Sequence, residues 1–113
     1  MHRTKKMLLL FAVLIVILSS WYVYHVHSNN LYIVSVIRLG LKNHNVEAQT
    51  IDVSFNQFKQ ERTIKIIFRD EPKAIYFYHY SFKSNEAFQL PKYGGSIKNH
   101  PEKGKHFKFD IAP

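Results

Sequence analysis

Hydrophobic residues gather at the start of the chain, behind a short basic segment. Residues 7–26 carry no charge, and Arg3, Lys5 and Lys6 lie just before them. At about 1.5 Å of rise per residue, a helix of this length reaches roughly the 30 Å of a bilayer's hydrocarbon core. Basic flanks normally stay in the cytoplasm. The pattern therefore predicts a single membrane span, with the N-terminus inside the cell and the rest of the chain outside.

A cleaved signal peptide is the alternative for this run, and a buried helix of a soluble protein is a third reading. The apolar block of residues 7–18 has the length of a signal-peptide core, and Ser20 or Ser28 can precede a cut. The run has no A-x-A site, and the bulky Trp21 and Tyr22 would follow the nearer cut. Because such rings suit the outer interface of a span, the prediction is an uncleaved anchor.

Helical periodicity continues beyond the apolar run. Within residues 29–45, one face carries apolar side chains at spacings of three and four, namely Leu31, Val34, Ile37 and Leu41. The segment is either a new helix capped by an asparagine or a continuation of the span. Its broad apolar face predicts an amphipathic helix that packs on a sheet.

Alternating polar and apolar residues then predict strands. They cover residues 46–55, 62–69 and 74–82, and residues 107–111 form one brief edge strand. The turn at residues 70–73 is short, so the second and third strands should pair as an antiparallel hairpin. Beyond the third strand, prolines and glycines predict loops.

Together these elements predict an α+β fold. An N-terminal transmembrane helix precedes an amphipathic helix, which packs on a small antiparallel sheet of three or four strands. The predicted organisation is a basic cytoplasmic N-terminus (1–6), an anchor (7–28), a small extracytoplasmic domain (29–90) and a basic, loop-rich tail (91–113). The tail is expected to be solvated and partly disordered, with contact to anionic wall polymers or lipid headgroups as the alternative.

Composition narrows the class of protein. A hydrophobic content of 46% with 15% aromatic residues argues against disorder over most of the chain. The absence of cysteine excludes disulfides, thiolate metal sites and cysteine nucleophiles. A net charge of +8 favours anionic surfaces, but only four arginines are present and no nucleic-acid motif occurs. Nucleic acid is therefore not a predicted partner.

One turn motif and the order of the elements resemble a known family. The sequence FRDEP at residues 68–72 leads into the aromatic strand YFYHY at residues 76–80. With the basic start, the apolar helix and the second helix, this resembles the domain-of-unknown-function 3139 family, small and mostly membrane-anchored proteins of Gram-positive bacteria. The resemblance extends to about Phe82, and Asn45 stands where the family often has a glycine. It implies architecture and membrane location, and no activity or site.

The histidines give no predicted metal site. His25 and His27 are two residues apart, which on a helix places them about 200° from each other around the axis. His100 and His106 lie in the irregular tail, with no cysteine in the chain and few acids nearby. A scatter of exposed histidines is the expectation, and no metal or cofactor is predicted.

Asp70 and Glu71 are the only adjacent acids. General acid–base pairs need two carboxylates held in different environments across a cleft, whereas neighbours in a tight turn point apart. Turn chemistry is therefore the expected role of these two residues. No nucleophile elbow, phosphate-binding glycine loop or zinc-protease motif occurs, and we predict no catalytic residues and no enzyme.

Tyr76, Tyr78 and Tyr80 share one face of the third predicted strand. Rings with one polar end suit a face that is half exposed or covered by a partner. Either the rings pack under the second helix with their hydroxyls at the rim, or they form a surface for a partner. The predicted function is a non-catalytic, membrane-anchored module that binds or modulates an envelope protein or an anionic wall polymer. The alternative is a small secreted binding or inhibitory protein, released by signal-peptide cleavage.

Overall fold

The computed structural model describes residues 2–56, 59 and 61–112. One long helix is followed by four strands and a short 3-10 helix, in the order α1 (His2–Asn43), β1 (Ala48–Asn56), β2 (Glu61–Phe68), β3 (Ala74–Ser81), β4 (Glu86–Gly95) and η1 (Pro101–Lys103). The strands form one antiparallel sheet in the order β1-β2-β3-β4. The predicted α+β fold, with an apolar N-terminal helix and a small antiparallel sheet, is confirmed.

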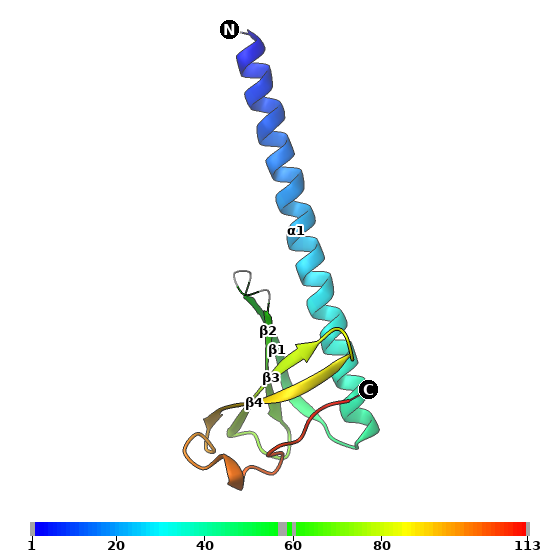
Figure 1. Ribbon diagram of the computed structural model, residues 1–113, viewed down its shortest axis with the longest axis vertical. Helices are drawn as coiled ribbons and strands as arrows, with labels where there is room; N and C mark the ends of the chain where they lie inside the picture. Colours follow the sequence, from blue (N-terminus) through cyan, green and yellow to red (C-terminus); the bar gives the residue numbers. More distant parts are fainter. Residues whose placement is uncertain (1, 57–58, 60, 113) are drawn as a thin grey trace.

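Helix α1 is unbroken from the apolar run into the folded domain, and its first half stands free of the sheet (Figure 1). Within Arg3–Asn43, the most apolar window has a mean hydropathy of 2.3, and none of that window is buried. This length and composition suffice to cross a membrane. A signal sequence near the N-terminus has the same properties. The two predicted helices are thus one helix.

The last turns of α1 belong to the domain. Ile33, Ile37 and Leu41 are at most 1% exposed and follow each other at intervals of four residues, so they form one narrow stripe. Leu31, expected on this face, is instead 58% exposed. The helix is apolar on most sides here, so periodicity alone did not identify the buried side.

Asn45 ends the helix in the left-handed conformation, with φ of 56°. The Val46 N–H donates to the Leu41 carbonyl at 2.9 Å, and the Asn45 N–H donates to the Lys42 carbonyl at 3.1 Å. These two bonds form a Schellman motif, in which glycine is the commonest residue and asparagine the usual substitute. The motif turns the chain back along α1 into β1.

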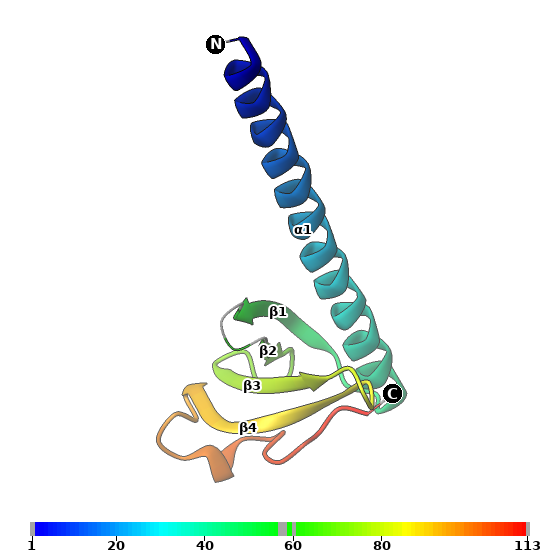
Figure 2. The same ribbon diagram turned by 45° about the horizontal axis from the view of Figure 1, so that its top comes forward.

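The sheet has an inner and an outer face. Side chains of β2 and β3 alternate between buried and half-buried, as the period of two in the sequence predicts. The inner face carries the fully buried side chains Ile64, Ile66, Phe68, Tyr76 and Tyr78. It packs against the buried stripe of α1, and the sheet lies to one side of the helix end (Figure 2).

Strand β4 was not predicted, and the domain boundary placed between residues 90 and 91 is wrong because it cuts this strand. Pro91 and the Gly94–Gly95 pair gave the segment the composition of a loop. In the structure the register shifts opposite Tyr76 and Tyr78, where Pro91 lies in the bulge of an edge strand. Proline is tolerated at such a position because no ladder hydrogen bond needs its missing N–H.

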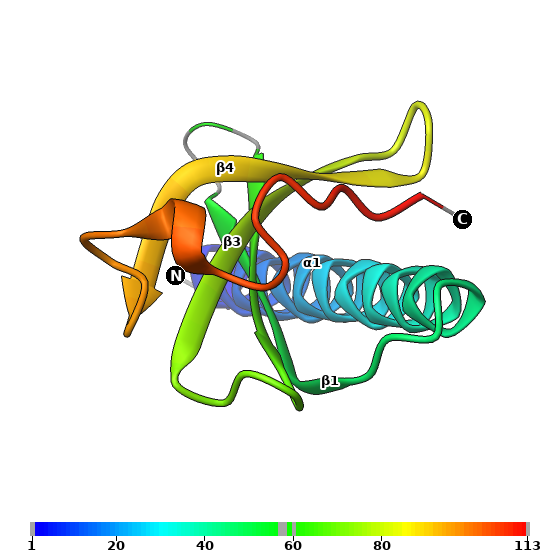
Figure 3. The ribbon, with the colours of Figure 1, turned by 90° about the horizontal axis from the view of Figure 1, so that it is seen from below.

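The segment after β4, residues 96–112, packs on the domain, contrary to the expectation of a solvated tail. Figure 3 shows it between β4 and α1. Ile97 and Ile111 are 3% and 2% exposed. The predicted edge strand is reduced to a single bridge, in which Ile111 and Ala87 exchange two hydrogen bonds of 2.9 Å. A Cβ atom on Gly40 would lie 2.8 Å from the Ala112 carbonyl oxygen, so glycine allows the segment to approach α1.

Candidate functional site

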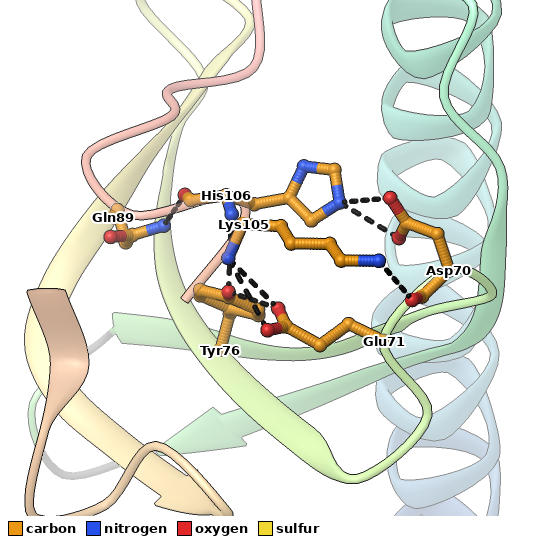
Figure 4. Close-up of polar contacts among 6 residues, drawn as sticks. All are labelled: Asp70, Glu71, Tyr76, Gln89, Lys105 and His106. Atoms are coloured by element: carbon orange, nitrogen blue, oxygen red, sulfur yellow. Dashed lines mark hydrogen bonds and ion pairs between the residues drawn. The ribbon is translucent and has the colours of Figure 1, made fainter. Parts of the chain in front are cut away.

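The densest polar network joins the β2–β3 turn to the C-terminal segment (Figure 4). Asp70 and Glu71 lie in this turn, which is closed by backbone bonds from the Glu71 N–H to the Phe68 carbonyl (3.1 Å) and from the Ala74 N–H to the Glu71 carbonyl (3.2 Å). Both carboxylates are directed at residues 104–111, here called the C-terminal strap. The two acids thus act on the same segment from adjacent positions.

Glu71 holds the start of the strap. Its carboxylate accepts a hydrogen bond from the Tyr76 hydroxyl and two from the Lys105 N–H, at 3.2 and 3.3 Å. The Tyr76 oxygen in turn accepts from the His106 N–H at 3.1 Å. Burial and the hydrogen bond to Glu71 raise the pKa of Tyr76. The hydroxyl therefore stays protonated and remains a donor to the carboxylate.

Asp70 binds the imidazole of His106. The Nε2 atom lies 2.9 and 3.1 Å from the two carboxylate oxygens, and the Lys105 ammonium donates to the Asp70 carbonyl at 3.0 Å. The hydrogen bond from His106 is the main cause that lowers the pKa of Asp70. The imidazole stacks on Phe68 with 3.9 Å between ring centroids, and its side chain is 11% exposed. This histidine, expected to be exposed, is part of the packed domain.

Gln89 on β4 holds the middle of the strap. Its Nε2 atom donates to the His106 carbonyl at 2.9 Å and to the Tyr78 hydroxyl at 3.1 Å. Its Oε1 atom accepts from the Lys108 N–H and from the Tyr93 hydroxyl, both at 2.8 Å. All four hydrogen-bonding positions of the amide are therefore in use. The amide spans the strap backbone and the aromatic side chains under it.

The predicted partner surface is not available in this structure. Tyr76 and Tyr78 are 0% exposed and Tyr80 is 3% exposed. Their hydroxyls donate to Glu71, to the Phe109 carbonyl (2.8 Å) and to Asn85 (2.9 Å), respectively. The reading in which the rings are packed fits this geometry, and the docking reading does not, because the strap and α1 cover the rings. The sequence analysis missed the part of this covering layer that the strap supplies, because Phe109 lies 31 residues after Tyr78 in the chain.

These hydrogen bonds attach the C-terminal strap to the β2–β3 turn. Asp70 orients one nitrogen of an imidazole, as an acid–base pair requires, but within the described part of the chain His106 bonds to Asp70 and Tyr76 and to no serine or threonine hydroxyl. Across residues 2–56, 59 and 61–112, no three histidine, aspartate or glutamate side chains gather closely enough to hold a metal ion. The sequence did contain one indication of this network, because the turn has the acids Asp70 and Glu71 and the strap has the basic residues Lys105 and Lys108.

A second feature is an open hollow at the end of α1 that lies away from the apolar half. It has a volume of about 420 Å³ and is lined by Arg38, Leu41, Lys42, Asn45, Val46, Glu47, Ala48 and Arg69. Arg69 is paired with Glu47 at 3.2 Å, and both side chains are exposed. Such a surface pair contributes little to stability.

No protein-family model matches the chain, and searches of the curated proteins and of the solved structures find no match either. The resemblance to the domain-of-unknown-function 3139 family therefore stays a prediction.

Proposed function

We propose that the chain is a single-pass membrane protein with a cytoplasmic N-terminus and an extracytoplasmic domain that binds or modulates a partner at the cell envelope without catalysis. One observation is the main support for membrane anchoring. The large apolar side chains from Met7 to Leu18 are 48–69% exposed on a helix that continues into the domain. Exposing so much apolar surface to water is costly, whereas the acyl chains of a bilayer accept it. Arg3, Lys5 and Lys6 support the orientation.

The continuous helix supports a role in which the domain is held rigidly at the end of its membrane anchor. Ile33, Ile37 and Leu41 are core residues of the domain, and they lie on the same helix as the apolar half. A domain built around the end of its own anchor keeps a set height above the membrane and a fixed orientation relative to the helix. The exposed lysines Lys92, Lys98 and Lys103 support contact with an anionic wall polymer, with an envelope protein as the other partner class.

The topology can be tested with single cysteines, because the chain has none of its own. Thr4→Cys and Lys98→Cys place one thiol before the apolar half and one in the domain, both at exposed positions. In intact cells, a membrane-impermeant maleimide should label Lys98→Cys at once and Thr4→Cys only after lysis. The reverse pattern, or equal labelling of both in intact cells, contradicts the proposal.

The partner can be tested by photo-crosslinking in intact cells. A photoreactive residue at exposed Gln49 or Lys98 should give adducts of defined mass or a polymer smear, and one at Thr4 should not. An absence of adducts from the domain positions contradicts partner binding while leaving the anchoring intact.

A released domain is the second candidate, and one observation favours it. Among the described residues the buried core begins at Ile33, so cleavage after Ser20 or Ser28 leaves the core complete. The intact mass of the mature protein separates the candidates. A full-length mass in the membrane fraction supports the anchor, and a shortened chain in the medium supports the secreted protein.

A further inference from the structure

Arg62 lies at the end of the sheet that faces the apolar half of α1. The β1–β2 hairpin points toward that half in Figure 1. The guanidinium carbon lies 4.5 Å from the ring centroid of Phe55 and 5.1 Å from that of Phe82. The Arg62 Nε–H donates to the Asn30 side-chain oxygen at 3.2 Å, which joins the hairpin to the helix.

Helix geometry sets the height of Arg62 above the membrane. Asn30 comes four residues after Val26, the end of the uncharged span, which corresponds to about 6 Å along the axis. The headgroup layer on each side of a bilayer is roughly 5–8 Å thick. When residues 7–26 cross the hydrocarbon core, Arg62 therefore lies within the outer headgroup layer.

The guanidinium has donors left for a ligand. Among the residues that the structure describes, its only hydrogen bond is the one from Nε, and no carboxylate pairs with it. The two Nη atoms form the fork that suits a phosphate group. Phe82, beside it, is 48% exposed, which is unusual for a phenylalanine but suits the apolar boundary of a membrane.

The charge at this end of the sheet also fits a phosphate-bearing surface. Lys59 and Lys83 are exposed at the two turns of this end, and Glu61 and Glu86 are the acids near them. With Arg62 the basic residues outnumber the acids. Basic residues beside exposed rings are typical of segments that lie in a lipid interface.

We propose that Arg62, held between Phe55 and Phe82, binds phosphate groups of outer-leaflet phospholipids and so holds the domain against the membrane. The proposal deepens the anchoring proposed above and rests on it. It assigns to the domain a second membrane contact, separate from the span, with anionic phospholipid as the favoured ligand. The contact fixes the domain's tilt, which a single helix alone leaves free.

The test uses the full chain in vesicles of phosphatidylcholine, with and without phosphatidylglycerol. A fluorophore on Ser84→Cys, an exposed position in the β3–β4 turn, reports quenching by lipids that carry a spin label on the headgroup. Quenching should be strong and rise with phosphatidylglycerol. Arg62→Gln should weaken headgroup contact about fivefold, which corresponds to one basic residue at a lipid surface. Arg69→Gln removes the same charge from the far end of β2 and should change nothing.

A third variant separates the charge of Arg62 from the shape of its guanidinium. Arg62→Lys retains the charge without the fork and should recover part of the quenching. Recovery of none of it, or equal quenching in Arg62→Gln and Arg69→Gln, overturns the proposal. If Arg62→Gln disturbs the fold, the dependence of the unmodified Arg62 chain on phosphatidylglycerol decides alone. Flotation of the chain with the vesicles separates the two claims, because a chain that floats with an unquenched probe contradicts only the headgroup contact.

Discussion

The two halves of α1 use the same kinds of residue for opposite environments. The first half carries leucine, isoleucine and valine in an uncharged run, and its side chains from Met7 to Leu18 are 48–69% exposed. In the second half, Ile33, Ile37 and Leu41 are at most 1% exposed. Among the residues that the structure describes, no strand folds back on the first half, whereas the sheet and the strap cover one face of the second. A hydrophobic helix is thus a core element only where other parts of the chain return to cover it.

The largest expected effect comes from truncating a side chain in the buried half. Ile37→Ala should lower the free energy of unfolding of the domain by about 3–4 kcal/mol, because it removes buried methyl groups and leaves a cavity. Ile15→Ala makes the same chemical change in the exposed half and should leave domain unfolding unchanged. Denaturant unfolding in mild detergent, followed by near-UV circular dichroism, measures both. Equal losses in the two variants contradict the division of the helix.

A smaller effect tests where the strap meets the helix. Alanine is favoured over glycine inside a helix by up to about 1 kcal/mol, so propensity alone predicts that Gly40→Ala stabilises the protein. A Cβ atom there would lie 2.8 Å from the Ala112 carbonyl oxygen and 2.9 Å from Ile111 Cγ2. Overpacking of this kind costs about 1–3 kcal/mol, so the net result should be a loss.

Thermal unfolding and the rate of proteolysis within residues 104–111 report this change. Gly40→Ala should lower the melting temperature and speed cleavage of the strap. Ser28→Ala, at an exposed position of the same helix, should do neither. A more stable Gly40→Ala protein would show that the strap does not depend on contact with α1.

The smallest effect concerns the strap's polar attachment. The pKa of Asp70 is lowered, chiefly by the hydrogen bond from His106, so the carboxylate is more acidic in the folded than in the unfolded protein. Its contribution to stability is therefore present above the unfolded value of about 3.9 and is lost as the pH falls through the folded pKa. Asp70 is 51% exposed, so solvent screening keeps the contribution below about 1 kcal/mol.

Unfolding titrations of wild type and Asp70→Asn, from neutral pH into the acid range, measure this contribution. The wild-type protein should lose more stability than Asp70→Asn below about pH 4. Asp110→Asn serves as a control, because Asp110 lies in the same strap and its carboxylate accepts from the Gln89 N–H instead. Identical acid slopes in wild type and Asp70→Asn contradict the attachment by His106.

Local patterns in the sequence were sufficient for the helical character of α1, though not for its continuity or its buried side, for the strand positions of β1, β2 and β3, and for the alternation of the tyrosine row. They were insufficient for β4, because Pro91 and two glycines resemble a loop until the bulge opposite Tyr76 and Tyr78 is known. They were also insufficient for the strap. Its order depends on contacts such as that from His106 to Asp70, 36 residues apart, and not on its own composition.

The tyrosine row shows most clearly what a local sequence pattern leaves undetermined. Alternation established that Tyr76, Tyr78 and Tyr80 share a face, and it said nothing about what covers that face. The cover comes from α1 at one end of the chain and from the strap at the other, and the hydroxyls find partners in Glu71, Asn85 and the backbone. A surface predicted for a partner is thus occupied by the protein itself.

One unbroken helix is proposed to pass from the membrane into the domain core. Nitroxide labels on single cysteines at successive positions from 8 to 43, in reconstituted membranes, test it directly. Oxygen should reach residues 8–18 freely, and a water-soluble nickel reagent should not. From residue 29 onward, collisions should oscillate with the helical period, with minima at 33, 37 and 41. Access of the nickel reagent within residues 8–18, or a break in the helical period before residue 43, would contradict a continuous membrane-spanning helix.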